Sequence, residues 1–279
     1  MNNVKIILFG SSRFIIPVIE NLRKNFDLVM VITTEKNPGD SVPSFCQTNK
    51  IPFLSVTTLS DPKLKSSIIN LKSPVAVLSY FGLFVPDSIL NSFPKGIINI
   101  HPSLLPKYRG PTPVQTAILN GETTTGVTII KLDSEIDHGK IFTQKTIEIS
   151  EKDTTSTLHE KLFSLGGEQL IPVIKDYLNG SLKPQEQDHS NATFTKRLSR
   201  NDGYIDFNNP PSKEKLDRMI RAYHPWPGAW TKFKVKSSKL KVIKFLPDKK
   251  IQIEGKKPMS YKDFTNGYPE AKEKIERFF

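Results

Sequence analysis

Three side chains near the middle of the chain could together promote chemistry at a carbonyl carbon. Asn99 offers an uncharged amide donor, His101 a group that gains or loses a proton near neutral pH, and Asp137 a carboxylate that could orient the imidazole or accept a proton. Such groups suit a reaction through a tetrahedral oxyanion. Each residue alone also has an ordinary explanation, because strand-end asparagines form turns and single histidines are often plain surface or core residues.

The sequence around Asn99 predicts a strand that brings two of these side chains to one edge of a sheet. Asn99 and His101 alternate with isoleucines, so in a strand both polar side chains point to the same face. The proline-rich segment 102–113 then predicts a rigid, irregular loop before a short helix at 114–119. Ligands of open α/β sheets bind at the carboxyl ends of the strands, where we expect this pair to lie.

Apolar runs separated by glycine, proline and polar residues predict an α/β order for most of the chain. We expect strands at 4–9, 28–33, 74–80, 97–101, 126–132 and 141–149, and helices at 14–23, 86–93, 114–119 and 155–177. This order is typical of a Rossmann-like, open and mostly parallel sheet.

The sequence around these three residues favours a functional interpretation more strongly than each residue does alone. The run from Asn99 to Gly110, followed by Gly126-Val-Thr-Ile-Ile and by Asp133 to Gly139, resembles the folate-dependent formyltransferases. The resemblance extends from Ile6 to Phe264 and is closest to the methionyl-tRNA formyltransferases. It implies transfer of a formyl group from 10-formyltetrahydrofolate to an amine.

The resemblance also implies roles for individual residues. It maps the catalytic trio of the family onto Asn99, His101 and Asp137. The residues that would line the folate site by the same mapping are Ser103, Leu104, Leu105, Pro106, Phe81, Leu83 and Asp133. We expect no metal, NAD or ATP, since the first strand is followed by neither a Gly-x-Gly-x-x-Gly dinucleotide loop nor a Walker loop.

Positive charge is concentrated in the last third of the chain. Residues 1–180 hold 18 Lys and Arg against 16 Asp and Glu, whereas residues 181–279 hold 22 against 12, so +10 of the formal net charge of +12 lies there. This asymmetry favours a polyanion as partner, although a lysine-rich solvated surface would look the same. The residues that we expect to contact tRNA are Lys36, Arg109, Lys234, Lys236, Lys239 and Lys241.

We expect two domains joined by a polar linker at 179–195. The first is a formyltransferase catalytic domain at 1–190, and the second is a basic C-terminal domain at 196–279. The chain after Trp230 is too short for a complete five-stranded barrel of ordinary strands, so a reduced, OB-like β domain is predicted. Its elements are a helix at 212–223 and strands at 232–236, 240–245 and 251–254.

Composition excludes several classes of protein. The hydrophobic content is 37%, and no apolar run approaches the length of a membrane span. The single cysteine, Cys46, rules out an internal disulfide framework and a thiolate zinc site. We therefore expect a cytoplasmic protein without a membrane contact, and a monomer.

The identity of the amine acceptor stays open at the level of sequence. Formylation of the α-amino group of methionyl initiator tRNA, in translation initiation, is the leading hypothesis. Loop 34–42 argues against it, because Lys36 is its single basic residue, whereas the resembling tRNA-directed enzymes have a longer, basic loop. The alternative is formylation of a nucleotide-linked amino sugar or another small amine. A non-catalytic RNA-binding protein is a third possibility, but the intact trio argues against it.

Overall fold

The computed structural model describes residues 4–37, 39–235 and 239–276, which fall into two compact units. The first unit comprises Met1–Gly110, Thr125–Ile147 and His159–Phe194, and the second comprises Pro111–Thr124, Glu148–Leu158 and Thr195–Phe279. The boundaries predicted for the two domains, 1–190 and 196–279, stay a prediction.

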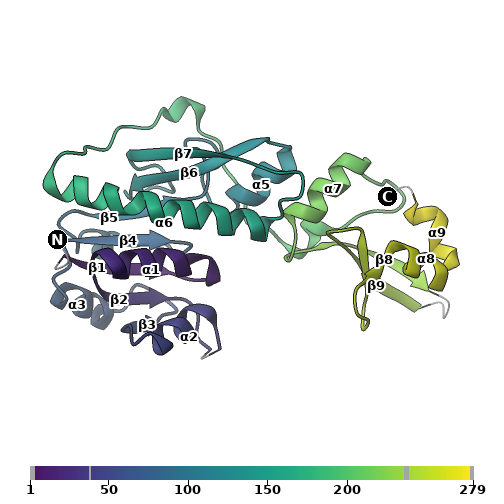
Figure 1. Cartoon of the computed structure of the whole chain (residues 1–279), viewed down its shortest axis with the longest axis horizontal. Helices are drawn as coiled ribbons and strands as arrows, with labels where there is room; N and C mark the ends of the chain where they lie inside the picture. Colours follow the sequence, from purple (N-terminus) through teal and green to yellow (C-terminus); the bar gives the residue numbers. More distant parts are fainter. Residues whose placement is uncertain (1–3, 38, 236–238, 277–279) are drawn as a thin grey trace. The chain divides into compact units, whose positions relative to one another are not determined.

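The first unit is built on a seven-stranded sheet with the strand order β3-β2-β1-β4-β5-β6-β7 (Figure 1). Strands β3, β2, β1, β4 and β5 run parallel, and β6 pairs antiparallel with β5. The predicted Rossmann-like, mostly parallel sheet is therefore confirmed. The strands are β1 (Lys5–Gly10), β2 (Asp27–Thr33), β3 (Phe53–Ser55), β4 (Val75–Ser79), β5 (Ile97–His101), β6 (Thr124–Lys131) and β7 (Ile141–Glu148).

Helices α1 and α6 lie against one face of this sheet. Gly166 of α6 has no room for a Cβ, which would come within 2.6 Å of Ile100 on β5, so the helix backbone approaches the sheet directly. The next residue, Gly167, makes a similar approach to Val18 of α1. The helices up to this point are α1 (Ile16–Asn25), α2 (Ser41–Thr48), α3 (Pro62–Asn70), α4 (Asp87–Leu90), α5 (Pro113–Asn120) and α6 (Thr155–Asn179).

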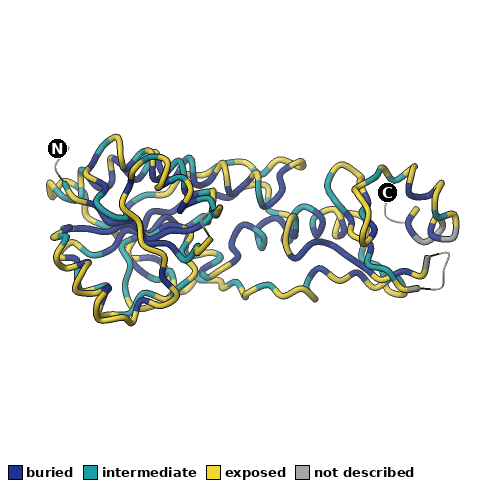
Figure 2. The backbone as a smooth tube through the Cα atoms, turned by 90° about the horizontal axis from the view of Figure 1, so that it is seen from below, coloured by how far each residue is buried: buried dark blue, intermediate teal, exposed yellow. Residues whose placement is uncertain are grey.

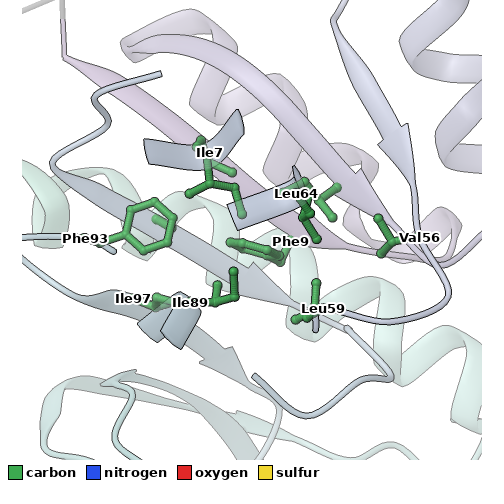
Figure 3. Close-up of a cluster of buried hydrophobic side chains, with 11 residues drawn as sticks. Ile7, Phe9, Val56, Leu59, Leu64, Ile89, Phe93 and Ile97 are labelled. Carbon is green, nitrogen blue, oxygen red and sulfur yellow. The ribbon is translucent and has the colours of Figure 1, made fainter. Parts of the chain in front are cut away.

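A hydrophobic core fills the opposite face of the sheet. Ile7, Phe9 and Ile97 of the strands pack beneath Leu64 of α3 and Ile89 of α4, all of them almost completely buried (Figure 3). The residues of the central strands β1, β4, β5 and β6 are correspondingly buried along most of their length (Figure 2). Burial of this apolar area is the main favourable contribution to folding. It leaves the polar ends of the strands as the part of the sheet that can serve a ligand.

Sequence analysis missed α2, β3 and α3, which connect β2 to β4. Strand β3 is short and exposed, with Phe53 and Leu54 at the edge of the sheet, so it lacks the apolar alternation of a half-buried strand. Helix α3 did have a readable signal. Asp61 caps its N-terminus by accepting a hydrogen bond from the Lys63 N–H, and Pro62 occupies the first helical position.

The second unit contains a four-stranded antiparallel sheet with the order β11-β10-β9-β8. This small β-sheet confirms the predicted small β domain at the C-terminal end of the chain. The closing helices α8 and α9 were not expected. The elements are β8 (Ala229–Val235), β9 (Lys239–Leu246), β10 (Lys250–Ile253), β11 (Met259–Ser260), α7 (Lys213–Ala222), α8 (Tyr261–Gly267) and α9 (Pro269–Ile275). Across residues 4–37, 39–235 and 239–276, the helices are all too short or too polar to cross a membrane.

A buried histidine on α6 makes the stability of the first unit depend on pH. The ring of His159 is 3% exposed and lies among Phe14, Tyr80 and Phe163, with centroid distances of 5.0, 5.3 and 5.9 Å. Its Nδ1 atom has no hydrogen-bond partner in the described ranges. Burial lowers the pKa of His159 from 6.5 to about 4, because the charged ring would lose its hydration.

We therefore expect the free energy of unfolding to decrease as the pH falls from 6.5 towards 4, since unfolded His159 binds a proton that folded His159 does not. The full effect would be about 3 kcal/mol. His159→Leu should flatten this slope in urea unfolding measured across the range. The control Leu64→Ala loses packing at every pH in the core cluster on the other face of the sheet and should keep the slope. An unchanged slope in His159→Leu would contradict the assignment.

Candidate active site at the end of strand β5

The structure brings Asn99, His101 and Asp137 together at the carboxyl end of β5. Asn99 Nδ2 donates to Asp137 Oδ1 across 3.3 Å, and His101 Nδ1 lies 3.4 Å from the same oxygen. Asn99 and His101 are 5% and 4% exposed. Both side chains leave the strand on the face that also holds Ile97, as the alternation along the strand requires.

The two ring nitrogens of His101 each face an oxygen. Nε2 lies 3.0 Å from the main-chain oxygen of Tyr108, in the loop that follows β5. A carbonyl oxygen can only accept, so Nε2 carries a hydrogen, while Nδ1 faces the carboxylate of Asp137. The doubly protonated ring satisfies both oxygens. The arrangement can therefore hold an imidazolium next to a carboxylate and fixes the orientation of the ring.

The carboxylate of Asp137 is held from several sides. Its Oδ2 accepts the Gly110 N–H at 2.8 Å, while its Oδ1 faces Asn99 and His101. Burial by itself would raise the pKa of Asp137. The charge of His101 and its hydrogen bond, the Gly110 N–H and the charge of Arg109 outweigh burial and lower that pKa below the usual 3.8. Asp137 is therefore ionised at neutral pH.

The loop after β5 is fixed by Thr128 and Gln144, which were not predicted as site residues, and by Ser103, which was expected to line the folate site. Thr128 of β6, opposite His101 in the sheet, accepts the Leu105 N–H at 3.1 Å, and Gln144 of β7 donates to the Leu105 carbonyl at 2.7 Å. Ser103 is fully buried and donates to the Lys107 carbonyl at 2.6 Å. Both main-chain polar atoms of Leu105 are thus satisfied within the protein.

Four other residues that were predicted to line the folate site are half-buried in the first unit. Phe81 and Leu83 are half-buried against the hydrophobic core, and the Phe81 ring meets Phe9 edge-on at 5.7 Å. Leu104 and Pro106 are also half-buried. The Leu104 side chain occupies the space that a Cβ on Gly126 would need.

Asp133 is more exposed than the catalytic trio and has its own histidine partner. Its Oδ2 accepts from His138 Nδ1 at 2.7 Å, and its Oδ1 accepts the Glu135 N–H at 3.0 Å. The ring of His138 stacks on His189 with a centroid distance of 4.0 Å. His138 therefore pairs with Asp133 rather than with the carboxylate of Asp137.

Residues 185–194 are hydrogen-bonded to the first unit and are counted with it, so their assignment to a linker at 179–195 was wrong. Gln185 exchanges main-chain hydrogen bonds with Ile141 at the start of β7, and Thr193 accepts both the Arg109 N–H and, through its hydroxyl, the Tyr108 N–H. The polar run in this segment resembles a solvated connection. Its polar groups are used instead to hold the loop after β5.

Arg109, expected at the tRNA interface, is 4% exposed. Its Nη2 donates to Gln187 Oε1 at 2.7 Å and to His189 Nδ1 at 2.8 Å. Because a buried guanidinium needs these partners, the geometry favours a structural role for Arg109. A direct contact between its side chain and tRNA stays a prediction.

The lysines expected to bind tRNA do not share one surface. Lys234 of β8 is exposed and lies opposite Leu240, whereas Lys241 of β9 lies opposite Phe233 and is half-buried. Neighbouring register pairs alternate between the faces of a sheet, so Lys234 and Lys241 point to opposite faces. Lys36 is exposed in the loop after β2. Lys236 and the side chain of Lys239 lie outside the described residues.

The face of the sheet that holds Lys234 carries further lysines. Lys232 is two residues from Lys234 on β8, Lys244 lies opposite Trp230, and Gln252 lies opposite Lys244. Each position two residues along a strand returns to the same face. We call this the lysine face; its exposed members are Lys232, Lys234, Lys244 and Lys250.

No metal site is evident in the described ranges, where no group of three or more His, Cys, Asp or Glu side chains is placed to hold an ion.

The sequence matches the family model described as "Formyl transferase" over residues 3–174, and that described as "Formyl transferase, C-terminal domain" over residues 197–250. The chain belongs to the formyl transferase family. This confirms the family inferred from the motif around His101.

Relatives and solved structures of formyl transferases resemble this chain along most of its length. A methionyl-tRNA formyltransferase of Roseiflexus sp. (strain RS-1) is 38% identical over 250 residues, covering 86% of this chain and 76% of the relative. A 4-N formyltransferase from Francisella tularensis has a TM-score of 0.70 at 21% identity and covers 89% of this chain and 100% of its own. A sugar N-formyltransferase from Shewanella sp FDAARGOS_354 has a TM-score of 0.69 at 18% identity and covers 88% and 98%. The two structures show that the fold is shared.

We expect Asp137→Asn to change how the free energy of unfolding of this formyl transferase depends on pH in the acid range. Because the pKa of Asp137 is lowered in the folded protein, its carboxylate stabilises the protein above the usual carboxyl pKa of 3.8, and the contribution disappears as the pH falls through the lower folded value. Urea unfolding measured at pH values around and below 3.8 should give a free energy of unfolding that changes less steeply with pH for Asp137→Asn than for the parent. The control Glu151→Gln removes an exposed carboxylate elsewhere. Equal slopes for Asp137→Asn and the parent would contradict the expectation.

Proposed function

We propose that this formyl transferase moves the formyl group of 10-formyltetrahydrofolate to the α-amino group of methionyl initiator tRNA. The observation that carries the proposal is the cluster of Asn99, His101 and Asp137, in a chain whose relatives at 38% identity are methionyl-tRNA formyltransferases. The bond between the formyl carbon and the folate nitrogen breaks, and a bond from that carbon to the amine forms. The products are formylmethionyl-tRNA and tetrahydrofolate.

Each member of the trio has a chemical role in this proposal. Asn99 donates a hydrogen bond to the oxyanion that develops when the amine attacks the formyl carbon. Protonated His101, whose two N–H groups face Asp137 and Tyr108, stabilises the same oxyanion by its charge. Asp137 keeps His101 oriented and, being ionised, accepts the amine proton directly or through water. The proton then becomes available to the folate nitrogen as it leaves. The close approach of all three groups to one point supports these roles.

The proposed folate site combines the loop after β5 with the turn after β4. Phe81, Leu83 and Leu132 are half-buried apolar side chains beside the same core cluster, and the partly exposed carboxylate of Asp133 follows Leu132 directly. Apolar walls next to a carboxylate fit a flat heterocycle that carries N–H donors. Ser103, Leu104, Leu105 and Pro106 would supply the opposite part of the site, on a loop held by Thr128 and Gln144.

The lysine face supports a polyanionic acceptor. Its exposed amines lie on one side of one small sheet, in the part of the sequence that holds most of the net charge. Lysines spaced along a sheet can follow the phosphates of an RNA backbone without reading its sequence. The proposal therefore places the acceptor end of the tRNA near the trio and uses the lysine face for the remainder of the tRNA.

A small amine is the second candidate for the acceptor, and the loop after β2 favours it. Glu35 accepts the Ser12 N–H at 2.6 Å and the Val42 N–H at 2.7 Å, and Asp40 accepts the N–H groups of Lys36 and Asn37. This acidic, internally bonded loop has little to offer an RNA. Incubation with 10-formyltetrahydrofolate and either methionyl initiator tRNA or nucleotide-linked amino sugars, with tetrahydrofolate release as the readout, distinguishes the two acceptors. A monomeric state and a cytoplasmic location stay predictions.

Alanine substitutions test the trio. Asn99→Ala, His101→Ala and Asp137→Ala should each lower the rate of formyl transfer by about 10² or more, because one missing oxyanion donor typically costs 10² to 10³. The double variant Asn99→Ala/His101→Ala should lose much less than the product of the single losses if both residues serve one oxyanion. A folded His101→Ala variant with near-normal turnover would remove His101 from the mechanism.

The lysine face makes a separate prediction about salt. Changing Lys232, Lys234, Lys244 and Lys250 to Gln should raise the KM for tRNA and weaken the salt dependence, which is about 0.7 to 0.9 in log affinity per phosphate contact per decade of salt. Folate affinity should not change. The control changes Lys24, Lys63, Lys65 and Lys72, which are exposed in the first unit, to Gln. Equal salt slopes for the lysine-face variant and the parent would show that this face does not contact tRNA.

A further inference from the structure

One buried glutamine connects the segment 185–194 to the loop that holds Asp137. Gln187 is 5% exposed and lies in the segment 185–194. Its Nε2 donates to the main-chain oxygens of Asp137 at 2.8 Å and of Gly139 at 2.7 Å. Its Oε1 accepts from Arg109 Nη2 at 2.7 Å and from Arg109 Nε at 3.3 Å. Both amide hydrogens and the amide oxygen are therefore in use.

The partners of Gln187 also fix which end of its amide is which. The oxygens of Asp137 and Gly139 can only accept, and the guanidinium of Arg109 can only donate, so one orientation of the amide satisfies all of them. A substitution that removes the N–H donors would leave two main-chain oxygens without these bonds. A buried acceptor without a partner costs about 1 to 3 kcal/mol.

The backbone at Asp137 needs such support. Its φ angle is +48°, in the left-handed region that a non-glycine residue occupies at a cost of about 1 to 2 kcal/mol. The backbone at Gly139, two residues further along this loop, packs directly against Lys131, because a Cβ on Gly139 would overlap the Lys131 carbonyl oxygen. The conformation at Asp137 sets where its carboxylate lies relative to His101 and Asn99.

We propose that Gln187 is a positioning residue for the reaction, which holds the Asp137 backbone so that the carboxylate faces His101 and Asn99. Gln187 itself does not touch that carboxylate or the reacting atoms. Within the segment 185–194 this role belongs to Gln187, because its side chain makes the hydrogen bonds to the Asp137 loop. This inference rests on the proposed function for its effect on the rate, but its effect on Asp137 does not depend on any substrate.

Two substitutions separate positioning from simple anchoring of the segment. Gln187→Glu keeps an oxygen acceptor for Arg109 and loses both donors to the Asp137 loop. Gln187→Met keeps the approximate length and loses every hydrogen bond. Gln185→Met is the matched control, since the side chain of Gln185 is exposed on the same segment and its main chain alone pairs with Ile141.

We expect Gln187→Glu and Gln187→Met to lower kcat about tenfold to hundredfold, the loss that small displacements of reacting groups typically cause. The KM for folate should change less. Gln185→Met should behave as the parent. Folding of every variant is verified by near-ultraviolet circular dichroism. Parent-like kcat in folded Gln187→Glu would overturn the proposal, because a residue that only anchors the segment through Arg109 tolerates this change.

A second measurement needs no substrate and keeps the two proposals distinguishable. The carboxyl carbon of Asp137 is titrated by ¹³C NMR in the parent and in each variant. Apart from Gln187, the groups that face Asp137 are His101 on β5, Arg109 and Gly110 on the loop after β5, and Asn99. If Gln187 positions Asp137, its pKa rises towards the usual value in both Gln187 variants and stays low in Gln185→Met. An unchanged pKa in the Gln187 variants overturns the inference.

A parent protein that formylates no amine would refute the proposed function and leave this titration as the test of Gln187. An active parent whose Gln187 variants keep both kcat and the Asp137 titration would refute the positioning role alone.

Discussion

A carboxylate that is largely removed from water must be compensated, and the site of this formyl transferase is arranged around that requirement. Asp137 is satisfied by an imidazole and an amide on β5 and by a main-chain N–H in the loop that follows this strand. Placing them within reach of one carboxylate requires β5 to end at His101 and the following loop to turn back at Gly110. Thr128 and Gln144 in turn hold the loop after β5, and Gln187 holds the loop that carries Asp137. The sheet and its two helical layers supply the fixed frame on which these contacts depend.

Sequence reasoning succeeded where a local pattern determines the structure. Strand β5 has the predicted ends, Ile97 and His101, because isoleucines alternate with polar residues from Ile98 to His101. The meeting of Asn99 with Asp137 followed from a family resemblance, because no local rule brings together residues so far apart in the chain.

The supporting residues were out of reach for a different reason. Gln187 lies in a run of polar residues that has no apolar period, and a solvated linker would have the same composition. Its hydrogen bonds to Arg109 and to the Asp137 loop depend on how distant segments meet, so nothing within the run marks it. The sequence also could not predict which face of the sheet each lysine occupies, because the register between β8 and β9 places Lys234 and Lys241 on opposite faces.

The path of the chain between the two compact units limits how the protein could be divided. Residues 111–124 and 148–158 are interruptions within the first unit and are counted with the second, so the units are not two consecutive stretches of sequence. Helix α5 lies in the first of these interruptions and packs against α7, far later in the chain. A gene fragment that stopped at residue 194 would encode α5 without α7, and part of the apolar surface of α5 would lose its cover. For this chain, therefore, no single break point yields two self-contained pieces that could be exchanged with those of a relative.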